Sequence, residues 1–247
     1  YGIPEAISAA VCTFENLEGA VDTVIQTIQI GIPIARIELL DDVQMDAINK
    51  YSGLDYPAKS TLFLEFHGSD HSVKEQAEMV QDLASENGGG DFQFATSTED
   101  RSKLWQARHD AAHSCNALRP GCVLWATDVC VPISRLAECI HETKKDLATA
   151  SMPAPLVGHV GDGNFHLCFI IDPDKPEEMA EAQTLNGRLI DRALDMDGTC
   201  TGEHGVGLGK IAYMEREHGE GISVMRAIKK TLDPDNIMNP GKIISMN

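Results

Sequence analysis

The sequence predicts an α+β fold: an enlarged ferredoxin-like sheet, antiparallel or mixed, with helices on one face and a C-terminal helical tail. Segments that favour strands and helices alternate from residue 6 to residue 198, and two neighbouring strands are joined by a tight turn. After residue 198 the chain changes to a glycine-rich loop, a helix and a proline-containing tail. We therefore expect a main domain over 1–198 and a C-terminal segment over 199–247. A parallel Rossmann sheet is the competing fold, but the hairpin and the lack of GxGxxG after a strand argue against it.

The first half of the chain alternates strands and helices with clear boundaries. Strands are expected over 6–14, 34–40, 60–68 and 91–96, and helices over 16–31, 42–53, 72–90 and 97–118. Asn16 is a typical helix N-cap, and Gly31 and Gly53 are typical helix ends. Ser97 or Thr98, followed by acidic residues, opens the last of these helices.

The second half continues this alternation. A strand is expected over 121–132, ending at Pro132, and a helix over 133–150. Residues 154–172 have the apolar flanks and the central turn of a hairpin. A long helix over 175–198 then ends at Gly198.

The composition is that of a globular, strongly acidic protein. The 247 residues are 43% hydrophobic and 23% charged, and the formal net charge is −18. This charge, without any cluster of Lys and Arg, argues against nucleic acid as a partner. No apolar run approaches the roughly 20 residues of a membrane span, and the first residues lack the basic and apolar parts of a signal peptide.

The cysteines point to a reducing compartment. There are 7 of them, an odd number, and no two form a CxxC pair. Free thiols are typical of cytoplasmic and mitochondrial proteins, so we expect one of these locations. For a bacterial cytoplasmic protein, association with the membrane is left as an alternative. A cysteine-based zinc site is not expected.

The segment GHVGDGNFHL places two histidines around an Asp-Gly turn. In a two-residue type I′ hairpin at Asp162 and Gly163, His159 would lie directly opposite His166. Directly opposed residues share one face, with Cβ atoms about 4.5–5.5 Å apart, which lets two imidazoles bind one metal ion. The alternative is a pair of partly buried histidines that only form hydrogen bonds to their neighbours.

The segment TGEHGVGLGK supplies a carboxylate and a further imidazole. Glu203 would complete a metal site of two histidines and one acid, and His204 follows it directly. The glycines around them allow the backbone to approach a ligand closely, although a flexible loop is the simpler interpretation. A phosphate-binding loop is the third, but the segment lacks the GxxxxGK[ST] spacing and its hydroxyl residue.

Three segments in order carry a resemblance to a known family: GHVGDGNFH, TGEHGVGLGK and LDPDNIMNPGKI. Together they resemble the C-terminal half of FAD-linked oxidases of the vanillyl-alcohol-oxidase superfamily, closest to the D-lactate dehydrogenase (cytochrome) group. WQARHDA, TDVCVPISRL and LFLEFHGS are similar to the same group, so motifs cover about residues 60 to 247, and residues 1–59 fit by position.

The resemblance implies a chemical role for the histidines and the acid. His159, His166 and Glu203 would hold a divalent metal, Zn, Mn or Fe, at the substrate site. His204 would be the catalytic base that takes the proton of the substrate hydroxyl. The metal would lower the pKa of that hydroxyl, and the flavin would then accept hydride from the adjacent carbon.

Two further positions concern the substrate. The resemblance implies that Arg108 binds the substrate carboxylate, whereas the residues alone favour a surface salt bridge with Asp110 or Asp100. Relatives that act on D-2-hydroxyglutarate carry Asn where this chain has Cys168 and Lys where it has Ala126. With Cys168 in the substrate site, the resemblance implies a small acid such as D-lactate. D-2-hydroxyglutarate and glycolate are the alternatives within the family.

The resemblance also implies partners. Asn239, Gly241 and Lys242 lie in the final stretch that returns to the flavin domain in this family, so they would contact FAD. Nothing in the chain resembles the N-terminal FAD-binding domain, and the first residue is Tyr1. We therefore expect this chain to be part of a longer protein and inactive alone, with a cytochrome, a quinone or another flavoprotein as electron acceptor.

Two other functions fit part of the pattern. A metal-dependent hydrolase would use the same two histidines and acid to activate water, but it leaves the NPGKI tail without a role. A non-catalytic metal-binding module would leave His204 without a role.

Overall fold

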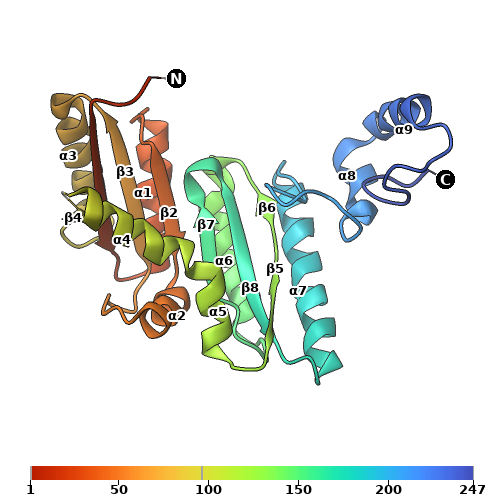
Figure 1. Ribbon diagram of the computed structural model, residues 1–247, viewed down its shortest axis with the longest axis horizontal. Coiled ribbons are helices and arrows are strands. Elements are labelled where there is room, and N and C mark those ends of the chain that lie inside the picture. Colours follow the sequence, from red (N-terminus) through yellow and green to blue (C-terminus); the bar gives the residue numbers. More distant parts are fainter. Residues whose placement is uncertain (1, 96, 247) are drawn as a thin grey trace.

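The computed structural model describes residues 2–95 and 97–246 and confirms the α+β class (Figure 1). Within these residues an 8-stranded sheet has the order β4-β1-β3-β2-β7-β8-β5, with β6 also paired to β8. Each of these strand pairs is antiparallel. The strands are β1 Ala6–Thr13, β2 Arg36–Leu40, β3 Thr61–Gly68, β4 Gln93–Ala95, β5 Val123–Ala126, β6 Val129–Cys130, β7 Leu156–His159 and β8 Asn164–Ile171.

The sheet consists of two ferredoxin-like halves joined at their edges. In the first half the order β4-β1-β3-β2 is that of a βαββαβ unit, and in the second half β7-β8-β5 repeats it without a fourth strand. The seam is the pairing of β2 with β7, where Leu39 lies opposite Gly158 and Leu40 opposite Val157. Both halves therefore contribute to whatever lies on the sheet beside this seam.

Helices cover both faces of the sheet, so the expected single helical face is only part of the arrangement. The larger apolar core lies under α1, α3, α6 and α7, and a second core lies under α2, α4 and α5 on the other face. Strands such as β3 are buried on both sides because their residues are apolar almost without interruption. The helices are α1 Leu17–Gln29, α2 Asp42–Ser52, α3 Asp70–Glu86, α4 Thr98–His109, α5 Ala111–Leu118, α6 Leu136–Leu147, α7 Pro176–Asp195, α8 Met214–His218 and α9 Gly221–Leu232.

Local capping fixes several helix ends as the sequence indicates. The Asn16 side chain accepts a hydrogen bond from the Gly19 N–H at 2.8 Å, and Ser97 accepts one from the Asp100 N–H at 3.0 Å. Gly53 ends α2 in the left-handed region, with φ 64°. These contacts satisfy main-chain groups that the helices leave unpaired.

Two expected elements are interrupted, and both interruptions border the candidate site. The helix expected over 97–118 divides at Asp110 into α4 and α5. The strand expected over 121–132 divides into β5 and β6, because the Thr127 N–H bonds to the Leu167 carbonyl and Asp128 leaves the strand pairing. The second break frees the Asp128 carboxylate to accept hydrogen bonds from Thr201 and the Gly202 N–H.

The C-terminal segment lies beyond α7, at the end of the sheet farthest from β4 (Figure 1). It contains α8, α9 and the loops that flank them. None of the helices in the described part of the chain has both the length and the apolar composition that crossing a membrane requires.

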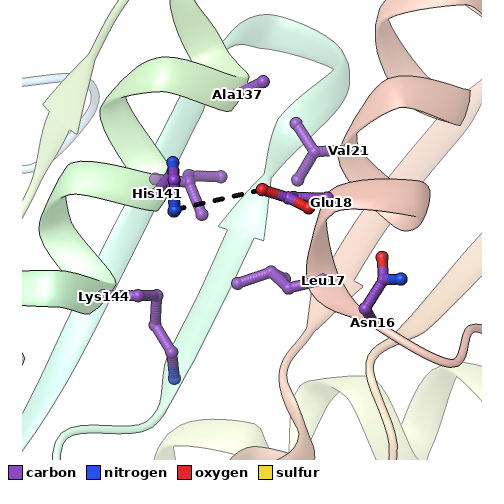
Figure 2. Close-up of a pocket in the computed structure, with 8 residues that line it drawn as sticks. Asn16, Leu17, Glu18, Val21, Ala137, His141 and Lys144 are labelled. Carbon is purple, nitrogen blue, oxygen red and sulfur yellow. Dashed lines mark ion pairs between the residues drawn. The ribbon is translucent and has the colours of Figure 1, made fainter. Parts of the chain in front are cut away.

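On the face with the larger core, α1 and α6 meet across the seam and border a cavity of about 240 Å³ (Figure 2). The Glu18 and His141 side chains face each other there, with Glu18 Oε1 3.9 Å from His141 Nε2. Lys144 reaches from α6 to Asp41, whose buried carboxylate also accepts a hydrogen bond from the Gln44 N–H at the start of α2. The contact of Lys144 Nζ with Asp41, at 2.9 Å, ties the second half to the first.

A buried ion pair at the start of α7 predicts acid sensitivity. Arg119 donates two hydrogen bonds to Glu178, and the Asp172 N–H adds a third. The hydrogen bonds from Arg119, and to a lesser extent the one from the Asp172 N–H, hold the pKa of Glu178 at about 2, below its ordinary value of 4.5. Because the folded pKa is depressed, the contribution to stability is fully present above the unfolded pKa. It is lost as the pH falls from about 4.5 toward 2.

We therefore expect Glu178→Gln to lower the free energy of unfolding by about 2 kcal/mol at pH 7. The difference from wild type should shrink progressively as the pH falls below 4.5 toward 2. Urea denaturation at several pH values measures it, with Glu177→Gln at the exposed neighbouring position as control. A difference independent of pH would contradict this assignment.

Candidate metal and substrate site

The histidine hairpin forms, but its register differs from the prediction. β7 and β8 are joined through residues 160–163, so His159 lies opposite Asn164 and His166 lies opposite Val157. The expected pairing of His159 with His166 is therefore wrong. The shift is by two residues, which keeps both histidines on the same face of the sheet.

The conformation of the turn explains the difference. Gly163 has a φ of 78°, but Asp162 belongs to a 3-10 turn and is not among the residues with positive φ. A type I′ hairpin requires positive φ at both positions, so the chain takes a longer connection. Val160 and Phe165 still point into the larger core, as expected from the alternation of faces.

Glu203 completes a cluster of three ligand-type side chains. The His159 and His166 rings lie nearly perpendicular, with centroids 5.8 Å apart. Glu203 Oε1 lies 3.3 Å from His159 Nε2 and 3.1 Å from His166 Nε2. One ligand atom from each of the three residues falls within 4.8 Å of the others. The structure thus brings together the three residues that the sequence singled out.

Both histidines present Nε2 to Glu203 because their Nδ1 atoms are fixed by hydrogen bonds to other groups. His159 Nδ1 lies 2.8 Å from Glu38 Oε1, and His166 Nδ1 lies 2.9 Å from the Thr127 carbonyl oxygen. Each acceptor requires a proton on Nδ1, so a neutral ring carries its lone pair on Nε2. With both rings neutral, the two Nε2 lone pairs and the Glu203 carboxylate offer three donor atoms to one cation. The donor set therefore fits a divalent metal, with the ring orientations fixed from the outer shell.

Charge states follow from the surroundings of each imidazole. Burial lowers the pKa of His166, which favours the neutral ring that a metal requires. The hydrogen bond to Glu38 raises the pKa of His159 against the opposing effect of burial. His204 is half exposed, and its ring stacks on that of His166 with centroids 4.8 Å apart.

Asp128 holds the loop that carries Glu203 and His204, and the sequence analysis did not single it out. Its buried carboxylate accepts hydrogen bonds from the N–H groups of Gly202, Glu203 and His204, at 2.9, 3.0 and 2.9 Å. Thr201 Oγ1 donates another at 2.7 Å. Burial alone would raise the pKa of Asp128, but the hydrogen bonds from Thr201 and His204 outweigh it and hold this pKa well below its ordinary value.

The surroundings of Asp128 leave the loop little freedom. Asn164 donates to Asp128 Oδ1 at 2.8 Å, and Lys210 Nζ donates to the Asp128 carbonyl oxygen at 2.6 Å. A Cβ atom added to Gly202 would lie 1.9 Å from Asn164 Nδ2, so only glycine fits there. The useful sequence signal was a single acid within the apolar segment WATDVCV.

A second group of ligand-type residues, Asp128, His166 and His204, shares His166 with the first. It is a poor metal site, because the Asp128 oxygens already accept several hydrogen bonds. His166 Nδ1 is committed to the Thr127 carbonyl, and stacked His166 and His204 rings do not aim their nitrogen atoms at one point. Of the two groups, the one that contains Glu203 has the donor geometry that better suits a cation.

Arg108 is linked to the cluster through Glu38, an acid that no sequence motif indicated. Its Nη2 and Nε atoms donate to Glu38 Oε2 at 3.0 and 3.3 Å, and Glu38 Oε1 contacts His159. Neither Asp110 nor Asp100 is the ion-pair partner of Arg108 among the described residues. The surface salt bridge that the residues alone favoured is therefore not formed.

Cys168 lies on the histidine face, as expected, but it is buried in the second core. The thiol of Cys115 and burial raise the pKa of Cys168 well above its ordinary value. Cys168 is 3% exposed, so it lies behind the surface that a ligand would touch.

The predicted cofactor residues lie in an exposed terminal loop with unusual backbone conformations. Asn239 and Gly241 have positive φ, and so does Ile243, at 72°, which is rare for a β-branched residue. The Ile243 N–H bonds to the Gly207 carbonyl at 2.8 Å. This bond attaches the terminal loop to the loop that carries Glu203 and His204.

Residues 3–243 match the profile of the family described as FAD linked oxidases, C-terminal domain. The chain is 51% identical over 247 residues to a probable mitochondrial D-lactate dehydrogenase of Danio rerio. Over 98% of its length it is 47% identical to a mitochondrial D-lactate dehydrogenase (cytochrome) of Arabidopsis thaliana and 31% identical to a glycolate oxidase subunit of Bacillus subtilis. It covers 50%, 43% and 52% of these three proteins, and so spans about half the length of the curated relatives it matches.

Solved structures show the same fold at low sequence identity. 4-Ethylphenol oxidase from Gulosibacter chungangensis has a TM-score of 0.72 at 16% identity, covering 98% of this chain and 54% of that one. p-Cresol methylhydroxylase has a TM-score of 0.66 at 14% identity, covering 97% and 53%. These likenesses concern the fold alone.

Proposed function

The chain belongs to the family of FAD linked oxidase C-terminal domains, as its motifs predicted, and on that premise we propose that it is the substrate- and metal-binding half of a flavin-dependent D-2-hydroxy acid dehydrogenase. The proposed reaction oxidises D-lactate, or a similar small D-2-hydroxy acid, to the 2-oxo acid. The observation that carries this proposal is the convergence of His159, His166 and Glu203 beside the guanidinium of Arg108.

The residues around the cluster have separate roles in the proposed reaction. The terminal edge of the Arg108 guanidinium, which Glu38 leaves free, binds the substrate carboxylate with two parallel hydrogen bonds. His204 accepts the proton of the substrate hydroxyl on an imidazole nitrogen, and stacking on His166 orients its ring.

Two groups that the chain would bind supply the remaining chemistry. A divalent cation held by His159, His166 and Glu203 would provide a Lewis acid that lowers the pKa of the substrate hydroxyl. FAD would provide the two-electron acceptor. The lone pairs on both Nε2 atoms, set by their Nδ1 partners, support the metal; Zn, Mn and Fe all suit two imidazoles and a carboxylate.

The C-terminal segment supports a flavin domain as intramolecular partner. It exposes a group of large apolar side chains in α9 and the loops beside it: Leu208, Val224, Ile228, Leu232, Ile237, Met238 and Ile243. Of these, Ile228, Leu232, Met238 and Ile243 line one open pocket, and exposed apolar surface of this kind is typical of a face that another domain covers. Asn239, Gly241 and Lys242 lie within it, consistent with contact to FAD.

The relatives support the substrate class and location of this proposal. Those named above act, by name, on D-lactate or glycolate, and two are named mitochondrial. We infer a mitochondrial protein that transfers electrons onward to a cytochrome, with a quinone or another flavoprotein as alternatives. D-Lactate is favoured over a dicarboxylate because Ala126 offers no charge to a second carboxylate and Cys168 is an uncharged residue buried in the second core. Glycolate is the second candidate, on the strength of the bacterial relative.

Metal content and turnover together test the proposal. The full-length protein, loaded with FAD, should contain about one equivalent of divalent metal and reduce an electron-accepting dye with D-lactate. His166→Ala should lose both, whereas His141→Ala, on the opposite face of the sheet, should lose neither. The 247-residue chain alone, given FAD and D-lactate, should reduce no dye. Full metal content and turnover in His166→Ala would refute the proposed site.

A further inference from the structure

Glu38 contacts two parts of the proposed site at once. Its Oε1 atom accepts a hydrogen bond from His159 Nδ1 at 2.8 Å. Its Oε2 atom accepts from Arg108 Nη2 at 3.0 Å and from Arg108 Nε at 3.3 Å. The side chains of Glu38 and Arg108 are each 13% exposed, so both contacts are largely withdrawn from water. One oxygen thus serves a proposed metal ligand and the other serves the proposed substrate-binding group.

The seam of the sheet places Glu38 between these partners. Leu39 lies opposite Gly158, and the same antiparallel register continued by one residue brings Glu38 opposite His159. Arg108 comes from α4, which packs on the first half together with residues of β1 and β3. Glu38 therefore joins a ligand carried by the second half to a guanidinium carried by the first.

A 2-hydroxy acid requires a fixed separation between these two groups. Its hydroxyl and carboxylate are on adjacent carbon atoms, so the groups that bind them must keep one distance and orientation. Glu38 holds both Arg108 and His159 through charge-assisted or carboxylate hydrogen bonds, which have defined geometry. We propose that Glu38 is a positioning residue that couples occupancy of the metal site to binding of the substrate carboxylate. This inference rests on the proposed function.

The coupling has a simple physical origin. A cation on His159 Nε2 withdraws electron density from the ring, which makes the Nδ1–H a stronger donor and fixes Glu38 in one rotamer. Glu38 in that rotamer holds Arg108 ready for a carboxylate. By thermodynamic linkage, a carboxylate bound to Arg108 must raise the metal affinity by the same factor.

Glu65 offers a matched control on the same face of the sheet. It lies on β3, is 8% exposed, and accepts a hydrogen bond from Trp105 Nε1 at 2.6 Å. Trp105 precedes Arg108 by one turn of α4, so Glu65 holds the same helix. Its other oxygen faces His67, and no contact with the proposed metal ligands occurs among the described residues.

The test measures Zn²⁺ affinity in the full-length, FAD-loaded protein by competition with a chromophoric chelator, without and with saturating propionate. Propionate offers Arg108 a carboxylate but has no hydroxyl. In wild type we expect propionate to tighten Zn²⁺ binding by about 5- to 150-fold. Glu38→Gln should weaken Zn²⁺ binding by about 10- to 100-fold and remove the propionate effect. Glu38→Asp should also remove it, because a chain one methylene shorter cannot span both partners.

The control variant and the wild-type protein distinguish coupling through Glu38 from a general loss of structure. Glu65→Gln should keep the wild-type propionate effect, and melting temperatures of all variants identify general loss of structure. A propionate effect that persists in both Glu38 variants, or that Glu65→Gln removes equally, overturns the coupling. Wild type that binds Zn²⁺ without a propionate effect overturns this inference and leaves the proposed function standing. Wild type that binds no Zn²⁺ overturns both.

Discussion

Replacing Asp128 with alanine is expected to abolish metal binding and turnover together. The carboxylate is the shared acceptor for three consecutive main-chain N–H groups, of residues 202 to 204, and for Thr201. A hydrogen bond to a charged acceptor such as this buried carboxylate contributes about 1.5–3 kcal/mol. The loop would then lose the position that brings Glu203 to the histidines. Misplacement by about 1 Å already costs about 10²-fold in rate, so we expect at least that loss in kcat/KM.

The measurement is metal content by mass spectrometry beside steady-state kinetics with D-lactate in the full-length enzyme. Asp162→Ala, at an exposed acid in the neighbouring hairpin turn, is the control and should behave as wild type. Asp128→Asn keeps one acceptor oxygen and should retain part of the metal. If the alanine variant bound metal with wild-type affinity, Asp128 would not be what holds the loop.

Replacing His204 with alanine is expected to lower kcat by about 10²- to 10⁴-fold while the metal stays bound. The His204 ring is half exposed, and its Nε2 lies 3.7 Å from Glu203 Oε1, farther than either proposed histidine ligand. Its contribution to the loop is the main-chain N–H that bonds to Asp128, which alanine retains. The loss should therefore fall on proton transfer, with KM for D-lactate little changed.

Added imidazole should restore part of the rate in His204→Ala, because a small base can occupy the space left by the ring. His113→Ala, at an exposed position of α5, is the matched control. Loss of metal from His204→Ala, or a rate equal to wild type, would rule out His204 as the base.

Local chemistry made much of the fold predictable from the sequence. Helix ends at Asn16, Gly53 and Ser97 follow from caps within a few residues, and strands such as β3 follow from short runs rich in apolar and aromatic residues. The clustering of His159, His166 and Glu203 was predictable from the hairpin and the glycine-rich loop, because a shift of two residues preserves the face of a strand. The exact hairpin register could not be predicted, since it depends on the conformation of a single turn residue.

The two acids that organise the site could not be assigned from local patterns. Glu38 meets partners 70 and 121 residues away, and Asp128 meets donors 73 to 76 residues away. The sequence alone indicates only that each acid has apolar residues close to it, and a charge that becomes buried must find partners. Glu38 meets His159 across the seam between the halves, whereas Asp128 meets its donors in the loop that follows α7.

The seam between β2 and β7 separates two tasks of the proposed function, and Glu38 is the contact described between them. His159, His166, Asp128 and the loop bearing Glu203 and His204 all belong to the second half or follow it, whereas Arg108 and Glu38 belong to the first. Under the proposed function, the half that performs the chemistry differs from the half that recognises the acid. Substitutions around α4 that leave Arg108 and its partner Glu38 in place can therefore shift selectivity from one 2-hydroxy acid to another without altering the proposed metal ligands or the proposed base.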